Sequence, residues 1–131
     1  MTLTHYIGGA NVAGTSGRVQ DVFNPATGSV IDQVPLASSS EVDSAVAAAK
    51  AALPAWADTP AAKRAQVMFN FRQLLHDNLE ELATLISSQH GKTLDDAKGE
   101  VARGLEVVEF ACGIPHALKG EYSPQVAGGV D

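Results

Sequence analysis

The first 35 residues alternate apolar and polar positions in short runs separated by turn residues, which is typical of β-strands. Runs at residues 3–7 and 12–13 flank Gly8-Gly9-Ala10-Asn11, and runs at 19–23 and 30–34 flank Asn24-Pro25-Ala26-Thr27-Gly28. In the second turn Pro25 fixes φ and Gly28 accepts a positive φ, so the chain reverses at little steric cost. The pattern predicts two β-hairpins in series within residues 1–36.

From residue 38 the apolar residues recur at intervals of three and four, which is the period of an amphipathic helix. Start and stop signals divide residues 38–117 into about four helices. The first is predicted to begin at Ser39 or Ser40, with Ser40 and Asp43 spaced as a capping box, and to end at Pro54. The second is predicted to begin at Thr59-Pro60, with the proline as the first helical residue.

The third predicted helix runs from an Asn78 cap, with Glu81 three residues later, to a left-handed terminus at Gly91. The fourth begins at Thr93, boxed by Asp96, frays near Gly113 and ends by Pro115. The predicted apolar stripes are, in order, Val42, Ala45, Val46, Ala49 and Leu53; Val67, Met68, Phe71, Leu74 and Leu75; Leu82, Leu85 and Ile86; and Ala97, Val101, Leu105, Val108 and Cys112.

The last part of the chain, residues 118–131, contains glycines and scattered apolar residues. Its sequence Gln125-Val126-Ala127-Gly128-Gly129-Val130 is predicted to be a loop leading into a strand. The predicted fold class is therefore α+β and mainly helical, with two N-terminal hairpins followed by about four amphipathic helices. A chain of 131 residues is expected to form one domain.

The composition is typical of a soluble globular protein, with 45% hydrophobic and 18% charged residues. Fifteen acidic and nine basic residues give a net charge of −6, which argues against nucleic acid as a partner because its binding requires a basic surface. No apolar segment approaches the ~18 residues of a membrane span, and residues 1–6 lack secretory-signal features. The single cysteine cannot form an internal disulfide, so we expect a cytoplasmic protein.

Few residues are arranged for metal or phosphate chemistry. The four histidines, His5, His76, His90 and His116, are scattered along the chain, so no metal site is expected. The pairs Gly8-Gly9 and Gly128-Gly129 match neither the dinucleotide fingerprint nor the P-loop, and both indicate turns.

Cys112 is a candidate nucleophile, because a thiolate paired with a base such as His116, one helical turn later, can attack a carbonyl group. The structural interpretation is favoured, since Cys112 lies on the same apolar stripe as Val101 and small free cysteines are usually buried. Pro115 also interrupts the helix that would align the pair.

Arg103 is the residue with the clearest functional potential. It lies two positions from Val101 and from Leu105, so it projects away from the apolar stripe, with Glu100 and Glu106 three residues to either side. One interpretation is a solvated face with weak surface ion pairs. The other starts from Gly104, since a mid-helix glycine costs up to ~1 kcal/mol and is explained by close approach of another element or a ligand.

Several stretches, taken in order, resemble the N-terminal part of NAD(P)-dependent aldehyde dehydrogenases. They are Ile7-Gly8-Gly9, Phe23-Asn24-Pro25-Ala26-Thr27-Gly28, residues 46–52 leading to Trp56, then Arg64, and Gly91-Lys92-Thr93. Within that superfamily, Arg103-Gly104-Leu105-Glu106-Val107-Val108-Glu109, followed by Ala111-Cys112 and Ile114-Pro115, resembles the CoA-acylating methylmalonate-semialdehyde dehydrogenases. Gly113 stands where that subfamily leads us to expect serine.

The resemblance implies that the chain is the N-terminal segment of a larger α/β enzyme of the aldehyde dehydrogenase fold. Such an enzyme oxidises methylmalonate or malonate semialdehyde with NAD and coenzyme A, giving propionyl-CoA or acetyl-CoA, and is expected to be a homo-oligomer. The catalytic cysteine, the oxyanion asparagine and the cofactor residues are implied to lie beyond Asp131. This chain would then bind no cofactor and be inert alone, and Cys112 would be structural.

The resemblance also gives Arg103 a role. A semialdehyde of this type carries a carboxylate, which a guanidinium can bind through two parallel charge-assisted hydrogen bonds. Arg103 is therefore the expected carboxylate-binding residue.

Two other interpretations of the chain remain open. It could be a helical interaction module that docks on full-length dehydrogenase subunits, or an independent small enzyme that uses Cys112 and His116. If the helices evolved to pack on an absent sheet, their apolar stripes are expected to stay exposed and the isolated chain to associate.

Overall fold

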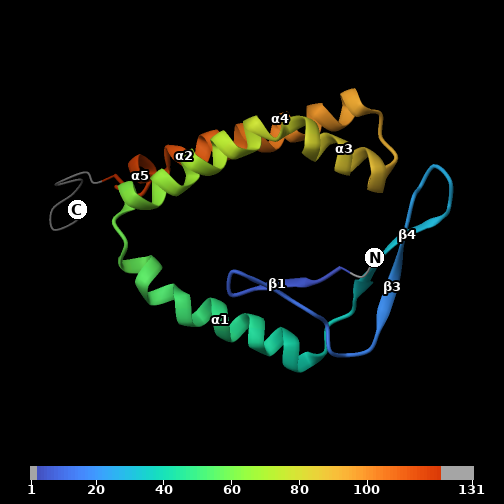
Figure 1. Cartoon of the computed structure of the whole chain (residues 1–131). Helices are drawn as coiled ribbons and strands as arrows, with labels where there is room; N and C mark the ends of the chain where they lie inside the picture. Colours follow the sequence, from blue (N-terminus) through green and yellow to red (C-terminus); the bar gives the residue numbers. More distant parts are fainter. Residues whose placement is uncertain (1–2, 122–131) are drawn as a thin grey trace, which may run out of the picture.

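The computed structural model describes residues 3–121 and contains two β-hairpins followed by helices (Figure 1). The elements are β1 (His5–Ile7), β2 (Ala10–Val12), β3 (Val19–Phe23), β4 (Val30–Pro35), α1 (Ser39–Asp58), α2 (Ala61–Asp77), α3 (Leu79–His90), α4 (Leu94–Cys112) and α5 (Ile114–Ala117). The predicted α+β, mainly helical class is confirmed. The strand expected within residues 125–130 lies outside the described residues.

The first hairpin turns more tightly than the sequence pattern predicted. Its antiparallel register pairs Ile7 with Ala10, so only Gly8 and Gly9 form the turn. Both glycines have positive φ, 61° and 83°, as a two-residue type I′ turn requires. Ala10 and Asn11, predicted as turn residues, belong to β2, because this turn matches the twist of the two strands.

The second hairpin has the predicted turn. Asn24 Oδ1 accepts hydrogen bonds from the amides of Ala26 and Thr27, and the Gly28 amide donates to the Asn24 carbonyl. Gly28 takes φ 71°, as predicted. The Leu3 amide donates to the Gln33 carbonyl, so the segment that leads into β1 lies against β4.

Helix α1 begins at Ser39, one of the two predicted starts, but its cap differs from the prediction. Its N-cap is Ser38, whose side chain accepts from the Glu41 amide, while the Glu41 carboxylate accepts from the Ser38 amide at 2.7 Å. The predicted box of Ser40 and Asp43 is wrong. The same Glu41 carboxylate accepts from the amide and the hydroxyl of Thr15, at 2.6 and 3.0 Å, and this long-range contact selects the register.

The predicted end of the first helix at Pro54 is also wrong, because α1 continues through Pro54 to Asp58. A proline inside a helix costs about 3 kcal/mol. The alanine-rich residues on both sides of Pro54 favour the helix and oppose this cost. The helix ends where Pro60 forces Thr59 into an extended conformation (φ −67°, ψ 126°). Pro60 is itself extended (φ −52°, ψ 139°), so it caps α2 rather than forming its first turn.

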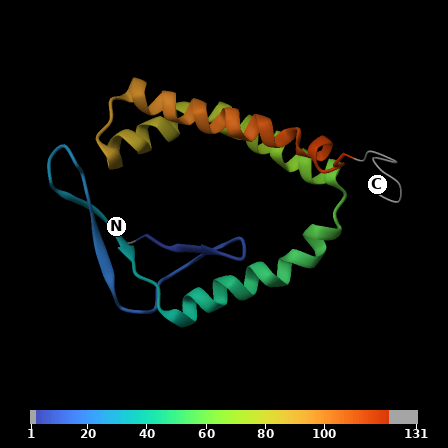
Figure 2. The ribbon, with the colours of Figure 1, turned by 180° about the vertical axis from the view of Figure 1, so that it is seen from behind.

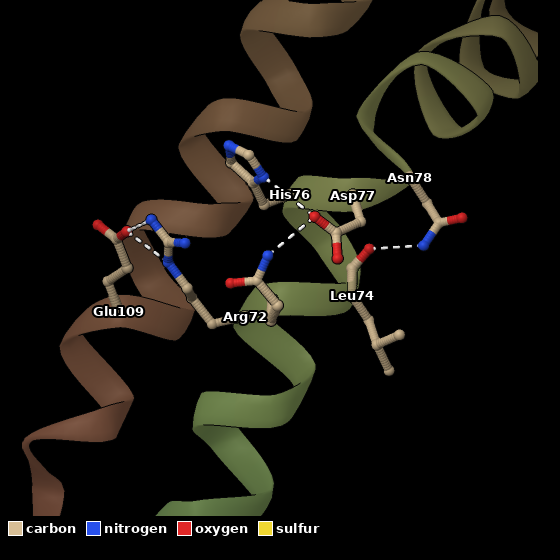
Figure 3. Close-up of polar contacts among 7 residues, drawn as sticks. Arg72, Leu74, His76, Asp77, Asn78 and Glu109 are labelled. Atoms are coloured by element: carbon tan, nitrogen blue, oxygen red, sulfur yellow. Dashed lines mark hydrogen bonds and ion pairs between the residues drawn. The ribbon is translucent and has the colours of Figure 1, made fainter.

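The junction of α2 and α3 uses Asn78 differently from the prediction. Asn78 occupies the N-cap position of α3, but its side chain makes no capping hydrogen bond there. Its Nδ2 donates instead to the Leu74 carbonyl at 2.8 Å, which satisfies the C-terminal end of α2 (Figure 3).

The connection from α3 to α4 is fixed at both helix ends. Gly91 closes α3 in the left-handed conformation, with φ 81°, as predicted. Thr93 caps α4 by accepting from the Asp96 amide at 3.3 Å. A Cβ on Gly91 would lie 3.0 Å from Pro25 Cγ, so the turn of the second hairpin packs directly on this connection.

Helix α4 packs against α2, α3 and α5, and the buried core of the described residues is small. It consists of Ala65, Ala83, Ala97, Val101 and Cys112. Ion pairs also link α4 to its neighbours. Arg72 Nε and Nη2 of α2 both donate to Glu109 Oε1 of α4, at 2.9 and 2.7 Å (Figure 3). Lys98 of α4 pairs with Glu80 of α3 at 2.6 Å. Helix α4 ends at Cys112 with Gly113 as its C-cap, before Pro115 as predicted. The chain then forms the single-turn α5, and Pro115 lies in its first turn.

Helix α1 lies apart from the α2–α4 layer in both views (Figures 1 and 2). None of its residues is buried, and its predicted stripe residues Val42, Val46 and Leu53 are each more than half exposed. Phe71 and Leu74 of α2 are exposed as well. The predicted stripes therefore exist, but the described part of the chain covers them only in part.

We expect the isolated chain to self-associate, because exposed apolar faces of this kind promote association. Size-exclusion chromatography with light scattering is expected to show oligomers. A monodisperse monomer that unfolds cooperatively would contradict this prediction.

Replacing Glu41 by glutamine removes the charged acceptor shared by Ser38 and Thr15. Four hydrogen bonds from these residues lower the pKa of Glu41 from 4.5 to about 2, the Ser38 amide contributing most. Because the folded pKa is the lower one, this stabilisation is fully present above pH 4.5 and is lost as the pH falls toward 2. We expect Glu41→Gln to make amide exchange at Thr15 and Ser38 several times faster at pH 7.

The matched control is Asp43→Asn, which removes the same charge from the next turn of α1. Asp43 caps nothing in the structure, so amide exchange at Thr15 and Ser38 should be unchanged. Equal effects of the two substitutions would mean that helix electrostatics alone, and not this bonding, orders the junction.

Gly91→Ala and Gly99→Ala are expected to change stability in opposite directions. Alanine at position 91 must adopt a left-handed conformation, at about 1–2 kcal/mol, and must also displace the Pro25 ring. Gly99 lies inside α4 with open space around its Cβ position, so alanine there should stabilise the helix by up to ~1 kcal/mol. Denaturant unfolding followed by far-UV circular dichroism measures both changes, and destabilisation by both would refute the explanation.

Candidate carboxylate site on helix α4

Helix α4 displays Arg103 on its exposed face, as its position relative to the apolar stripe predicted. Val101 is buried and Leu105 is half-buried, whereas Arg103 between them is exposed. The helix runs nine residues on either side of Arg103 and is capped at Thr93. The guanidinium is therefore carried by a rigid element and not by a loop.

Glu100, one turn before Arg103, is paired with a lysine from the preceding connection. Lys92 Nζ lies 2.5 Å from Glu100 Oε1, and both side chains are partly shielded from solvent. The Lys92 hydrogen bond lowers the pKa of Glu100, and the charges of Lys92, His90 and Arg103 add to the effect. Within residues 3–121, Arg103 is exposed and forms no hydrogen bond and no ion pair, so its five donors have no partner in this part of the chain.

Beside Arg103, Gly104 lines an apolar groove between α2, α3 and α4. The groove has a volume of about 430 Å³ and is otherwise lined by Phe71, Leu75, Leu82, Leu85, Ile86, Val101 and Val108. No described atom lies within 4 Å of the Cβ position of Gly104. The close approach that Gly104 suggested is therefore not made by this part of the chain, and the α4 backbone is open at Gly104.

Cys112 and His116, the candidate nucleophile and base, do not form a catalytic pair in the structure. Cys112 is 9% exposed and belongs to the small core, as the structural interpretation predicted. His116 lies in α5, beyond the break at Gly113, and is exposed. The described residues show no hydrogen bond between the two side chains.

The other candidate features carry no site in the described residues. Gly8-Gly9 is a hairpin turn, as predicted, and Gly128-Gly129 lies outside the described residues. Residues 3–121 contain no group of three histidine, cysteine or acidic side chains placed to hold a metal ion. Over the same range, no helix has the length and apolarity needed to cross a membrane.

Sequence reasoning assigned no role to Lys92 or Arg64. Lys92 follows the C-cap of α3 and precedes its partner Glu100 by eight residues, a spacing that no helical periodicity reveals. Arg64 and Trp56 line an apolar cavity of about 200 Å³ near α5, where Arg64 Nε is buried without a partner among the described residues. Arg103 is the residue of the predicted site that the structure leaves accessible.

Comparison with known proteins places the chain in a family. The sequence profile described as "Aldehyde dehydrogenase family" matches residues 12–130. A malonate-semialdehyde dehydrogenase of Pseudomonas aeruginosa is 54% identical over 130 residues, which is 99% of this chain and 26% of that protein.

Solved structures agree with the sequence comparison. A Sinorhizobium meliloti protein, described as a methylmalonate-semialdehyde dehydrogenase and solved with NAD, has a TM-score of 0.91 and 53% identity. The methylmalonate-semialdehyde dehydrogenase of Oceanimonas doudoroffii has a TM-score of 0.90 and 48% identity. The two alignments cover 98% and 96% of this chain and 26% of each solved chain.

The chain thus spans about a quarter of the length of these relatives, and it has the conformation of the matching part of their fold. A match over nearly all of the sequence, at this identity, settles its ancestry. The chain belongs to the aldehyde dehydrogenase family, as an N-terminal portion of that fold.

Proposed function

We propose that this chain is part of an NAD-dependent, CoA-acylating dehydrogenase that oxidises malonate semialdehyde or methylmalonate semialdehyde to acetyl-CoA or propionyl-CoA. The observation that supports this most directly is Arg103, a guanidinium on a rigid helix with no ion-pair partner among residues 3–121; the next residue, Gly104, lines an open apolar groove. The names of the relatives identify the same class of substrate, an aldehyde that carries a carboxylate.

In this proposal Arg103 binds the substrate carboxylate. The planar guanidinium offers two parallel N–H donors that match the two carboxylate oxygens, whereas an uncharged aldehyde provides no such acceptor. The contact fixes the far end of the substrate and so favours carboxylated aldehydes over plain ones. Gly104 leaves room beside the helix for the substrate or for the segment that encloses it.

The described residues do not fit a nicotinamide dinucleotide. A dinucleotide site of the usual kind needs a glycine-rich turn that opens a helix after a strand, so that backbone amides face the pyrophosphate. The glycines with positive φ in residues 3–121 lie in hairpin turns, in loops or at the C-cap of α3, and none of them opens a helix. No glycine of the described segment therefore forms a dinucleotide site of this kind.

We propose that the nucleophile, the oxyanion donor and both cofactor sites belong to the other three-quarters of the enzyme, so that this segment alone is inert. Cys112 supports the proposal, since a buried thiol in a helical core is not available to an aldehyde. NADH release by the purified 131-residue chain would contradict it. The full enzyme is proposed to be a cytoplasmic homo-oligomer, from the family resemblance.

Arg103→Ala in the full-length enzyme is expected to raise KM for malonate semialdehyde about 10- to 100-fold. This is the loss of affinity that corresponds to the free energy of a charge-assisted hydrogen bond. KM for propanal, which has no carboxylate, should stay within about twofold. Arg103→Lys should be intermediate, because it keeps the charge and loses the paired donors.

Steady-state kinetics with both aldehydes measures these effects, and Lys63→Ala, at an exposed position of α2, serves as the control. Equal losses with malonate semialdehyde and propanal would remove Arg103 from substrate selection.

A further inference from the structure

Two acidic residues of α4, one on each side of Arg103 along the helix, are paired with cations from other elements. Glu100 lies three residues before Arg103 and pairs with Lys92 of the α3–α4 connection, at 2.5 Å. Glu109 lies six residues after it and accepts both hydrogen bonds from Arg72 of α2. Arg103, which lies between these pairs, takes part in neither.

Glu100 is the natural partner of Arg103 on an isolated helix. Residues three apart are neighbours on a helix surface, and an acidic residue N-terminal to a basic one is the more favourable order. The charge of Arg103 contributes to the lowered pKa of Glu100, so the two groups interact electrostatically. The larger contribution comes from Lys92, which holds the carboxylate through a direct hydrogen bond.

The backbone at Lys92 is fixed by its two neighbours. Gly91 holds the left-handed C-cap of α3 against Pro25, and Thr93 caps α4. The side chain of Lys92 therefore extends from a fixed backbone position just before α4, and it is 27% exposed. Pairing with Glu100 then requires ordering of the side chains only, which lowers its entropic cost.

We infer that Lys92 is a positioning residue for substrate selection: by binding Glu100 it keeps that carboxylate from pairing with Arg103, which stays available for an anionic substrate. This inference rests on the proposed carboxylate-binding role of Arg103. Without Lys92, Glu100 competes with the substrate for the guanidinium and also repels the substrate carboxylate. The effect is confined to substrates that carry a negative charge.

Glu106 is the other acidic neighbour of Arg103, and it tests whether any nearby carboxylate acts in the same way. It lies three residues after Arg103, in the less favourable order for a helix pair, and it is exposed. Glu106→Gln is therefore the matched control for Glu100→Gln, since both remove one negative charge at equal spacing from Arg103.

The experiment compares KM and kcat for malonate semialdehyde and propanal in the full-length enzyme. Lys92→Met is expected to raise KM for malonate semialdehyde about two- to fivefold, as a competing surface ion pair would, with kcat and the propanal constants unchanged. Lys92→Arg keeps the pair and should keep KM. The double variant Lys92→Met/Glu100→Gln should return KM to the starting value, whereas Lys92→Met/Glu106→Gln should not.

The outcomes separate the two proposals. If Arg103→Ala raises KM selectively but Lys92→Met does not, the role of Lys92 is refuted and carboxylate binding by Arg103 stands. If Arg103→Ala shows no selectivity, both are refuted. Equal losses of Lys92→Met with the two aldehydes, or failure of Glu100→Gln to rescue it, would show that the pair only stabilises the connection.

Discussion

The three residues between α3 and α4 are the constraint on which the described structure depends. Gly91 ends α3 with a positive φ that other residues adopt at a cost, and Thr93 starts α4 by capping its first turn. Pro25 packs against Gly91, which brings the second hairpin to the same point. Pro25 and Gly91 lie more than 60 residues apart in the sequence but pack against each other. The Pro25 ring occupies space that a Cβ at position 91 would crowd, and Gly91 has no Cβ.

The small core follows from how closely α3 and α4 approach. Ala83 and Ala97 are fully buried, and small residues at a helix contact allow a short distance between the axes. The large apolar residues are then directed to the outer faces, where they line the groove beside Gly104 or remain exposed along α1 and α2. This explains how a chain with an average apolar content has so small a buried core among its described residues.

The sequence predicted the elements better than their boundaries, and the errors share a physical cause. Ser38 and Ser40 each precede an acidic residue by three positions, so local spacing cannot choose between them; Thr15 makes the choice through Glu41. Pro54 predicts a stop, yet α1 continues through it and ends only at Thr59, which is extended before Pro60. Asn78 occupies the predicted position but bonds backward to Leu74. At Ser38 and at Asn78 a competing contact overrode a correct local rule.

The candidate site shows the same limit. Helical spacing placed Arg103 on the exposed face of α4, since that depends on neighbours in one helix. Its accessibility depends on which carboxylates are already paired, and those partners come from the α3–α4 connection and from α2. A lone arginine flanked by acidic residues is normally a weak surface ion pair. Here the tertiary structure gives Glu100 and Glu109 partners other than Arg103. Selectivity for an anion can therefore depend on residues that never contact it.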